Sequence, residues 1–140
     1  MPTRKGSASW QGDLKGGTGE VRFADFAGPY SFPSRFEEGP GTNPEELIGA
    51  AHAACFSMAF SNMLSQAGHV PVDVSTTAAV TLDIGPDGAY VSGIALDCTA
   101  NVPGIDDAEF AEISEQAKDG CPISKALAAT PITLTAILTA

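Results

Sequence analysis

The sequence predicts an α+β fold in which one long, apolar helix lies across an antiparallel sheet. Strand-like segments come in hairpins, without the regular alternation of strand and helix that indicates a doubly wound parallel sheet. The segment from Thr42 to Leu64 is apolar nearly all round, which is typical of a helix buried inside a protein. Because 140 residues suffice for one sizeable core, we predict a single domain over residues 1–140.

Charge and composition exclude several classes of partner. The formal net charge is −10, with only seven Lys and Arg residues, whereas nucleic acids and anionic membranes are bound through clustered basic side chains. We therefore expect no nucleic-acid partner and no membrane partner. No stretch has the pattern of a secretory signal, so we expect a cytoplasmic location. Cysteines in that reducing compartment are more often reactive or buried than joined in structural disulfides.

The first part of the chain is predicted to be a hairpin followed by a loop. Residues 6–12 and 18–26 contain side chains that suit strands, and the glycine pair between them suits a tight turn. From Gly28 to Gly41 the density of glycine and proline indicates a loop. This loop carries Arg35, one of the few basic residues of the chain.

The long helix has well-marked ends. Asn43 is a suitable N-cap, Pro44 suits the first helical position, and Glu46 has the spacing of a capping box. Gly68 is the stop signal, which gives a helix of about 22 residues and roughly 33 Å. Its charged and polar side chains make it a poor membrane span. A helix this apolar has more surface to bury than one small sheet can cover, so we expect a partner subunit.

The second half is predicted to be a long hairpin followed by helices and a last strand. Residues 72–84 alternate apolar and polar side chains with period two, and residues 90–102 do the same after a Gly-Pro-Asp-Gly turn. The remaining elements are a helix from Asp106 or Asp107 through Lys118, a short helix from Cys121-Pro122, and a strand from Pro131 to Leu138.

The three cysteines have different predicted surroundings. Cys98 shares the core face of its strand, where a free cysteine behaves as a small hydrophobe. Cys121 lies at a helix N-terminus, which favours a thiolate, although a plain helix cap fits its position as well. Cys55 lies in mid-helix among apolar residues, so desolvation alone raises its pKa and leaves it inert. For Cys55 to react, a cation must approach it, and Arg35 is the best placed.

Helix geometry limits which side chains can serve Cys55. Glu45 lies about 15 Å away along the helix axis, too far for direct contact, so another subunit could supply it. By itself Glu45 is a first-turn acid that complements the helix dipole. His52 lies one turn before Cys55, and a Cys-His pair suits nucleophilic or metal chemistry. The paired spacings of zinc sites are absent, which favours a packed or hydrogen-bonded histidine. We expect no metal and no cofactor.

The segment Thr42-Asn43-Pro44-Glu45-Glu46 and its continuation to Ala51-His52-Ala53-Ala54-Cys55-Phe56-Ser57-Met58 strongly resemble the signature of the osmotically inducible protein C (OsmC) family. The similarity extends upstream through Pro29-Tyr30 and Ser34-Arg35-Phe36-Glu37. Downstream it includes Val102-Pro103-Gly104-Ile105-Asp106, Lys118 and Gly120-Cys121-Pro122, so it covers nearly the whole chain. The residues around Cys55 resemble OsmC proper more than its organic hydroperoxide resistance relatives.

The resemblance implies a thiol-dependent peroxidase that forms an intertwined homodimer, with each site built at the subunit interface. It implies that Cys55 is the peroxidatic cysteine and Cys121 the resolving cysteine. Arg35 would hold Cys55 as a thiolate, and Glu45 would orient Arg35. In the implied cycle a hydroperoxide oxidises Cys55 to a sulfenic acid, which condenses with Cys121, and an external dithiol reduces the disulfide. Local helix geometry alone would nominate Cys121 as the more acidic thiol.

Two functions are compatible with these residues. The first is an enzyme that reduces hydroperoxides, with organic ones preferred because residues such as Phe56 and Met58 make an apolar site. The second is a non-catalytic binding or redox-sensing dimer whose cysteines oxidise once to switch a partner interaction. The four candidate site residues together favour the enzyme, since a scaffold needs no cation beside a buried thiol.

Overall fold

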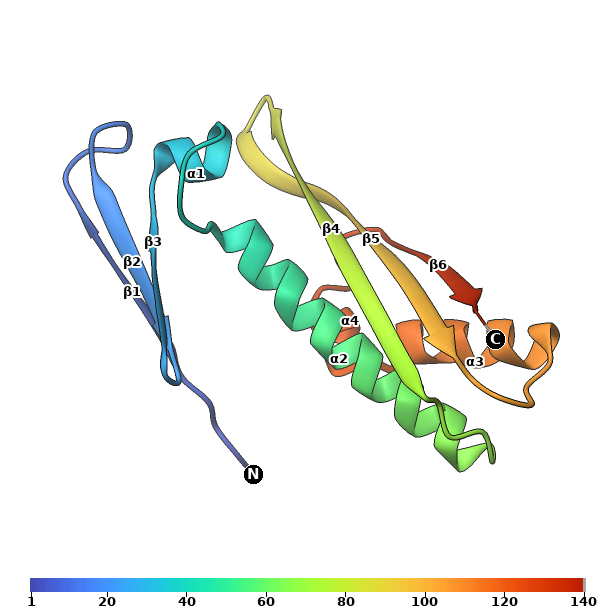
Figure 1. The fold of residues 1–140 in the computed structure, drawn as a ribbon. Helices are drawn as coiled ribbons and strands as arrows, with labels where there is room; N and C mark the ends of the chain where they lie inside the picture. The colour runs from blue at the N-terminus through green and yellow to red at the C-terminus, as the bar shows by residue number, and fades with distance from the viewer. Residues whose placement is uncertain (140) are drawn as a thin grey trace. The chain divides into compact units, whose positions relative to one another are not determined.

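The computed structural model describes residues 1–139, and its elements confirm the predicted α+β class (Figure 1). The described residues form two compact units, Met1–Leu47 and the chain from Ile48 onward, which we treat separately. The single domain over residues 1–140 stays a prediction. In chain order the elements are β1 (Gly6–Gln11), β2 (Thr18–Phe23), β3 (Phe26–Tyr30), α1 (Phe32–Phe36), α2 (Pro44–Gln66), β4 (Asp73–Gly85), β5 (Gly88–Asn101), α3 (Asp107–Gly120), α4 (Pro122–Ala126) and β6 (Ile132–Leu138).

The first unit contains a three-stranded antiparallel sheet in the order β1-β2-β3. The hairpin of β1 and β2 was predicted, but the strand predicted over residues 18–26 is in fact two strands. The chain reverses at Ala24, which has a positive φ of 50°, and returns as β3. Pro29 lies in β3, which is an edge strand of this sheet, and an edge tolerates a residue that has no N–H to donate.

The loop predicted from Gly28 to Gly41 contains the end of β3 and the short helix α1. Ser31 caps α1, because its hydroxyl accepts from the Ser34 backbone N–H while the Ser34 hydroxyl accepts from the Ser31 N–H. Pro33 lies in the first turn, where its missing N–H costs no hydrogen bond. Proline density alone therefore gave the wrong interpretation, and a Ser-x-x-Ser cap was the signal for a helix.

Helix α2 begins and ends as predicted, with one difference at the cap. The Asn43 side chain accepts from the Glu46 backbone N–H at 2.8 Å. The Glu46 carboxylate accepts from the Thr42 hydroxyl at 3.1 Å, so it takes part in the cap through a side chain. At the other end Gly68 has a φ of +91°, a conformation that suits glycine and lets the following N–H bond back to Leu64.

The second unit is built on the long β4–β5 hairpin, with α2 packed along β4 (Figure 1). Gly49 allows close approach, because a Cβ there would lie 2.9 Å from the Ala78 carbonyl oxygen of β4. The core combines one face of β5 with α2 and α3, and Phe60 of α2 meets Phe110 of α3 with ring centroids 5.3 Å apart. The fully buried large side chains of α2 are His52, Phe56, Phe60 and Leu64.

The opposite face of α2 is not buried within one chain, which agrees with the prediction that this helix has more apolar surface than one small sheet can cover. Met58 is 76% exposed, and Ala50, Ala51 and Ala54 are exposed as well. By length and composition α2 could also cross a membrane, although only 28% of its most apolar window is buried. Its packing against a sheet is that of a core helix in a soluble protein.

The last strand corrects the predicted sheet. The sheet order is β4-β5-β6, and β6 pairs with β5 in parallel rather than antiparallel. The physical reason is the connection: α3 and α4 lie between the two strands, and such a helical crossover returns the chain in the same direction. The crossover also places the start of α4 next to α2 in the core, as the contact between Cys121 and Cys55 shows.

Candidate active site

The structure brings Cys55 and Cys121 together. The Cys121 thiol donates to Cys55 Sγ at 2.9 Å, although the two residues are 66 positions apart in sequence. Cys55 is half-buried on α2, whereas Cys121 is fully buried at the junction of α3 and α4. All three cysteines are free thiols in this structure. A contact this short leaves only a small movement of sulfur before a disulfide can form.

The two thiols of this pair differ in acidity. Burial raises the pKa of the Cys55 thiol, the contact with Cys121 raises it further, and the Ile123 backbone lowers it only in part. Burial also raises the pKa of Cys121, but hydrogen bonding with Cys55, Ser124 and Ile123 outweighs it, so the pKa lies below the ordinary thiol value. Within this unit Cys121 is the thiol that holds a negative charge more easily, as helix geometry predicted.

The surroundings of Cys121 come from the first turn of α4. Cys121 is the N-cap residue, Pro122 follows it, and the Lys125 N–H bonds to the Cys121 carbonyl at 3.0 Å. Its thiol makes no cap hydrogen bond in this state, in which it donates to Cys55. The free N–H groups at the start of the helix nevertheless act on a thiolate through their dipoles.

Arg35 and Glu45 form an ion pair within the first unit. Arg35 is on α1 and donates through Nε to Glu45 Oε1 at 2.8 Å. The Glu45 side chain is 10% exposed and that of Arg35 36%. The second carboxylate oxygen of Glu45 is buried and has no hydrogen-bond partner among residues 1–139. Glu45 therefore fixes the guanidinium group as well as lying in the first turn of α2.

An aromatic pocket lies beside Arg35 in the first unit. Its volume is about 250 Å³, and Arg35 also contacts the Phe36 ring, with its guanidinium carbon 5.3 Å from the ring centroid. The sequence did not indicate this pocket, since its walls come from two separate segments, residues 10–14 and 30–36. The lining residues are Trp10, Leu14, Tyr30, Ser31, Phe32, Arg35 and Phe36.

His52 is hydrogen-bonded, as predicted. It is fully buried, and its Nε2 lies 2.7 Å from Ser124 Oγ, while Nδ1 has no partner among the described residues. Burial lowers the pKa of His52, so the ring is neutral at physiological pH. No group of three or more His, Cys, Asp or Glu side chains in residues 1–139 could hold a metal ion. Sequence reasoning missed Ser124, whose only signal was its position three residues after Cys121.

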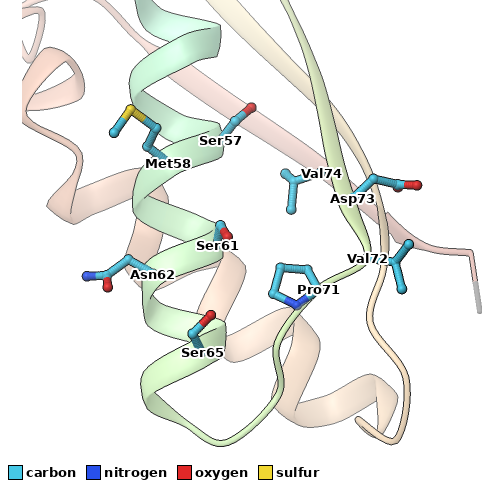
Figure 2. A pocket seen from close by; sticks show the side chains of 9 residues that line it. All are labelled: Ser57, Met58, Ser61, Asn62, Ser65, Pro71, Val72, Asp73 and Val74. Carbon is cyan, nitrogen blue, oxygen red and sulfur yellow. The ribbon is translucent and has the colours of Figure 1, made fainter.

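Two residues expected near the nucleophile lie elsewhere. Phe56 is in the core and Met58 is on the exposed face of α2, so neither encloses Cys55 within the chain. Met58 instead borders a surface groove of about 530 Å³ between α2 and the start of β4. Figure 2 shows Ser61 and Ser65 facing Pro71 across this groove, with Met58 directed away from the strand.

Comparison with known proteins places the chain among OsmC-like proteins. Residues 37–136 match the OsmC family, described as OsmC-like protein. The chain is 51% identical over 129 residues to the peroxiredoxin OsmC of Escherichia coli (strain K12), covering 90% of each chain. It is 37% identical over 89 residues to the organic hydroperoxide resistance protein of Xanthomonas axonopodis pv. citri, covering 63% of this chain and 61% of that protein.

The fold is also similar to that of solved structures. A crystal structure of an organic hydroperoxide resistance protein OsmC from Legionella pneumophila superposes with a TM-score of 0.78 at 26% identity. The superposition covers 99% of this chain and 100% of that chain. The similarity therefore extends over the first and second units alike, beyond the residues matched by the family comparison.

Proposed function

This chain belongs to the family of OsmC-like proteins, and on that premise we propose that it is a thiol-dependent peroxidase that reduces hydroperoxides. Cys55 attacks the peroxide oxygen, an alcohol or water leaves, and Cys55 becomes a sulfenic acid. Cys121 condenses with that sulfenic acid to a disulfide, and an external dithiol reduces the disulfide. A peroxiredoxin OsmC and an organic hydroperoxide resistance protein among the relatives support this chemistry.

The observation that carries the proposal is the 2.9 Å contact between Cys55 and Cys121 sulfur atoms. A peroxidatic thiol must be reachable by substrate, and a resolving thiol must be within reach of the first. Cys55 is half-buried and suits the peroxidatic role, whereas Cys121 is fully buried and suits the resolving role. If Cys121 were the peroxidatic cysteine and Cys55 the resolving one, the hydroperoxide would have to reach a sulfur that has no exposed surface.

The proposal requires a cation for Cys55, because burial raises its pKa and holds it as an inert thiol. Arg35 is the proposed cation, and the carboxylate of Glu45 orients it. The ion pair at 2.8 Å supports the second part, since it fixes the guanidinium before any substrate binds.

Organic hydroperoxides are the proposed preferred substrates. Phe56 and Met58 do not enclose Cys55, but the aromatic pocket beside Arg35 supports this preference, because its volume of about 250 Å³ accommodates a small organic group. Hydrogen peroxide gains nothing from such a pocket, because it has no apolar part to bury.

The working unit is proposed to be a homodimer in the cytoplasm. The support is the exposed apolar face of α2, on which Met58 is 76% exposed next to a row of alanines. A face of this kind on a long helix is usually covered by another subunit. A reducing cytoplasm would supply the dithiols that the proposed cycle requires.

Steady-state consumption of tert-butyl hydroperoxide and hydrogen peroxide, with dithiothreitol as reductant, tests the proposal. Cys55→Ser should abolish consumption of both, since serine cannot form a sulfenic acid. Arg35→Ala should slow consumption by about tenfold to a thousandfold, because Cys55 loses the charge that lowers its pKa. Full activity in Cys55→Ser would exclude the proposed function.

The alternative is a non-catalytic redox-sensing or binding dimer. Such a protein would consume one equivalent of hydroperoxide per protomer, form the disulfide once, and stop even with dithiol present. The same assay separates the two functions, because an enzyme consumes many equivalents.

A further inference from the structure

A buried hydrogen bond connects the two helices that carry the reactive cysteines. His52 of α2 and Ser124 of α4 lie 2.7 Å apart, and their exposed fractions are 0% and 5%. His52 precedes Cys55 by one helical turn, and Ser124 follows Cys121 by three positions. The proposed reaction cycle leaves both residues without a function. Burying a polar side chain is costly unless it is hydrogen-bonded, and an apolar pair would fill the same space without that requirement.

The donor and acceptor of this bond can be assigned. A neutral histidine has one N–H, and Nδ1 has no partner within the described chain. If Nδ1 carried the proton, the Nδ1–H donor would be buried without a partner. The Ser124 hydroxyl would then donate its proton to Nε2 and could donate to no other group. If Nε2 carries it, His52 donates to Ser124 Oγ, and the Ser124 proton remains free. We assign the second tautomer from this network.

The free Ser124 proton has an acceptor close by. Ser124 lies in the first turn of α4, which Cys121 caps and which the bond from Lys125 N–H to the Cys121 carbonyl closes at 3.0 Å. In this turn the Ser124 side chain is one of the hydrogen-bonding groups that lower the pKa of Cys121. When Cys121 is a thiol it donates to Cys55, so the donation from Ser124 matters only once Cys121 has lost its proton. A thiolate is a stronger acceptor than a thiol, which gives the Ser124 hydroxyl a preferred direction in that state.

We propose that His52 is a positioning residue: it holds the Ser124 hydroxyl toward the Cys121 sulfur, so that Cys121 attacks the Cys55 sulfenic acid as a thiolate. This inference rests on the proposed function. The network consists of His52 Nε2–H, Ser124 Oγ–H and Cys121 Sγ, in that order of donation. Every member belongs to the second unit and comes from α2 or the start of α4.

The chemical step is balanced without a further reagent. Cys121 thiolate attacks the Cys55 sulfur, an S–S bond forms, and the S–O bond breaks. The hydroxide that leaves takes up the proton lost by Cys121, which yields water. The Cys121 sulfur is oxidised and the Cys55 sulfur reduced. The same network stabilises Cys121 as leaving group when an external dithiol attacks Cys55, which is the exposed sulfur of the pair.

Within residues 1–139, the titratable and charged groups around this network come from α2, α3 and α4. Cys55 and His52 face Cys121 and Ser124 from α2. On the α3 and α4 side, Lys118, Asp119 and Lys125 share a surface hollow with Ser124. The Lys118 ammonium pairs with the Glu115 carboxylate at 3.0 Å, so its charge is directed toward Glu115.

The first experiment measures the Cys121 thiolate directly, in the full-length double variant Cys55→Ser/Cys98→Ser, by absorbance at 240 nm against pH. Adding Ser124→Ala or His52→Leu should shift the titration midpoint to higher pH. His52→Gln keeps an N–H donor near the position of Nε2 and should restore most of the original midpoint. Ser114→Ala is the matched control, because it removes another buried hydroxyl that bonds only within α3, and it should leave the midpoint unchanged.

The second experiment follows the resolving step with all three cysteines present. Reduced protein receives one equivalent of tert-butyl hydroperoxide, and dimedone traps the remaining sulfenic acid at timed intervals. In Ser124→Ala the disulfide should form about threefold more slowly at neutral pH. Each tenfold loss of thiolate is offset about threefold by the greater nucleophilicity of a more basic sulfur.

The outcomes separate this inference from the proposed function. The thiolate titration needs no peroxide, so it can be read even if the protein shows no turnover. Unchanged midpoints in both Ser124→Ala and His52→Leu, with normal circular dichroism, would overturn the inference while leaving a peroxidase intact. If the titration midpoint shifts in His52→Leu and shifts equally in His52→Gln, the cause is altered packing and not the lost N–H donor. That result would also overturn the inference.

Discussion

Cys98 and Cys121 belong to the same hydrophobic core and are 2% and 0% exposed, yet their acidities move in opposite directions. Burial raises the pKa of Cys98, and the Thr76 side chain offsets only part of that rise. Cys121 is as deeply buried, but hydrogen bonding lowers its pKa. Burial alone therefore does not decide whether a core cysteine is inert.

The difference between these two regions lies in the backbone. Cys98 is in the middle of β5, where neighbouring strands pair with both sides of the chain and take up its N–H and C=O groups. Cys121 is at the start of α4, where the first N–H groups of a helix have no backbone partner. Of these two fully buried cysteines, the one with the lowered pKa is therefore the one that lies where secondary structure ends.

Replacing each cysteine by serine should affect turnover very differently. We expect Cys121→Ser to lower steady-state peroxide consumption with dithiothreitol by about tenfold or more, because the sulfenic acid is no longer resolved within the protein. Cys98→Ser should change it by less than about twofold, since the Cys98 thiol donates to the Thr99 carbonyl and takes part in no step of the proposed cycle. Equal losses in the two variants would show that burial, rather than position, determines function.

The pH at which each thiol ionises should follow the same order. In single-cysteine proteins, Cys55→Ser/Cys98→Ser reports on Cys121 and Cys55→Ser/Cys121→Ser reports on Cys98. Because the pKa of Cys121 is lowered and that of Cys98 raised, thiolate absorbance should appear at lower pH for Cys121. A reversed order would contradict the comparison. Circular dichroism at each pH checks that the fold is retained.

The free energy of unfolding should differ least between the two variants, and here Cys98→Ser should have the larger effect. Cys98→Ser puts a hydroxyl among apolar side chains and should lower the free energy of unfolding by about 1–3 kcal/mol. Cys121→Ser should cost less than about 1 kcal/mol, because serine is a favourable N-cap for α4. Urea unfolding under reducing conditions measures both, and a larger loss in Cys121→Ser would contradict the prediction.

Much of the second unit could be predicted from sequence because its patterns are local. Period-two alternation located β4 and β5, and cap and stop residues located α2. The parallel pairing of β6 could not be predicted, since strand direction depends on how α3 and α4 cross over. For α2 the composition predicted an excess of apolar surface, but which side of the helix is exposed could not be predicted, because packing decides which side is covered.

The candidate site was predictable in its residues and only partly in its contacts. The surroundings of Cys121 followed from Gly120 and Pro122, which mark where one helix ends and another begins. The bond between His52 and Ser124 joins residues 72 positions apart, and no local pattern reports such a pairing. The aromatic pocket beside Arg35 was missed in the same way, because its lining residues come from several elements.

The short contact between Cys55 and Cys121 also has a thermodynamic consequence for the reaction cycle. A disulfide across these 66 positions would close a long loop, and the chain-entropy account gives about 4 kcal/mol of stabilisation for a loop of this order. The oxidised protein should therefore resist heat and proteases better than the reduced protein. Each reduction by dithiol returns the enzyme to its less stable form, so the catalytically ready state is the one more exposed to degradation.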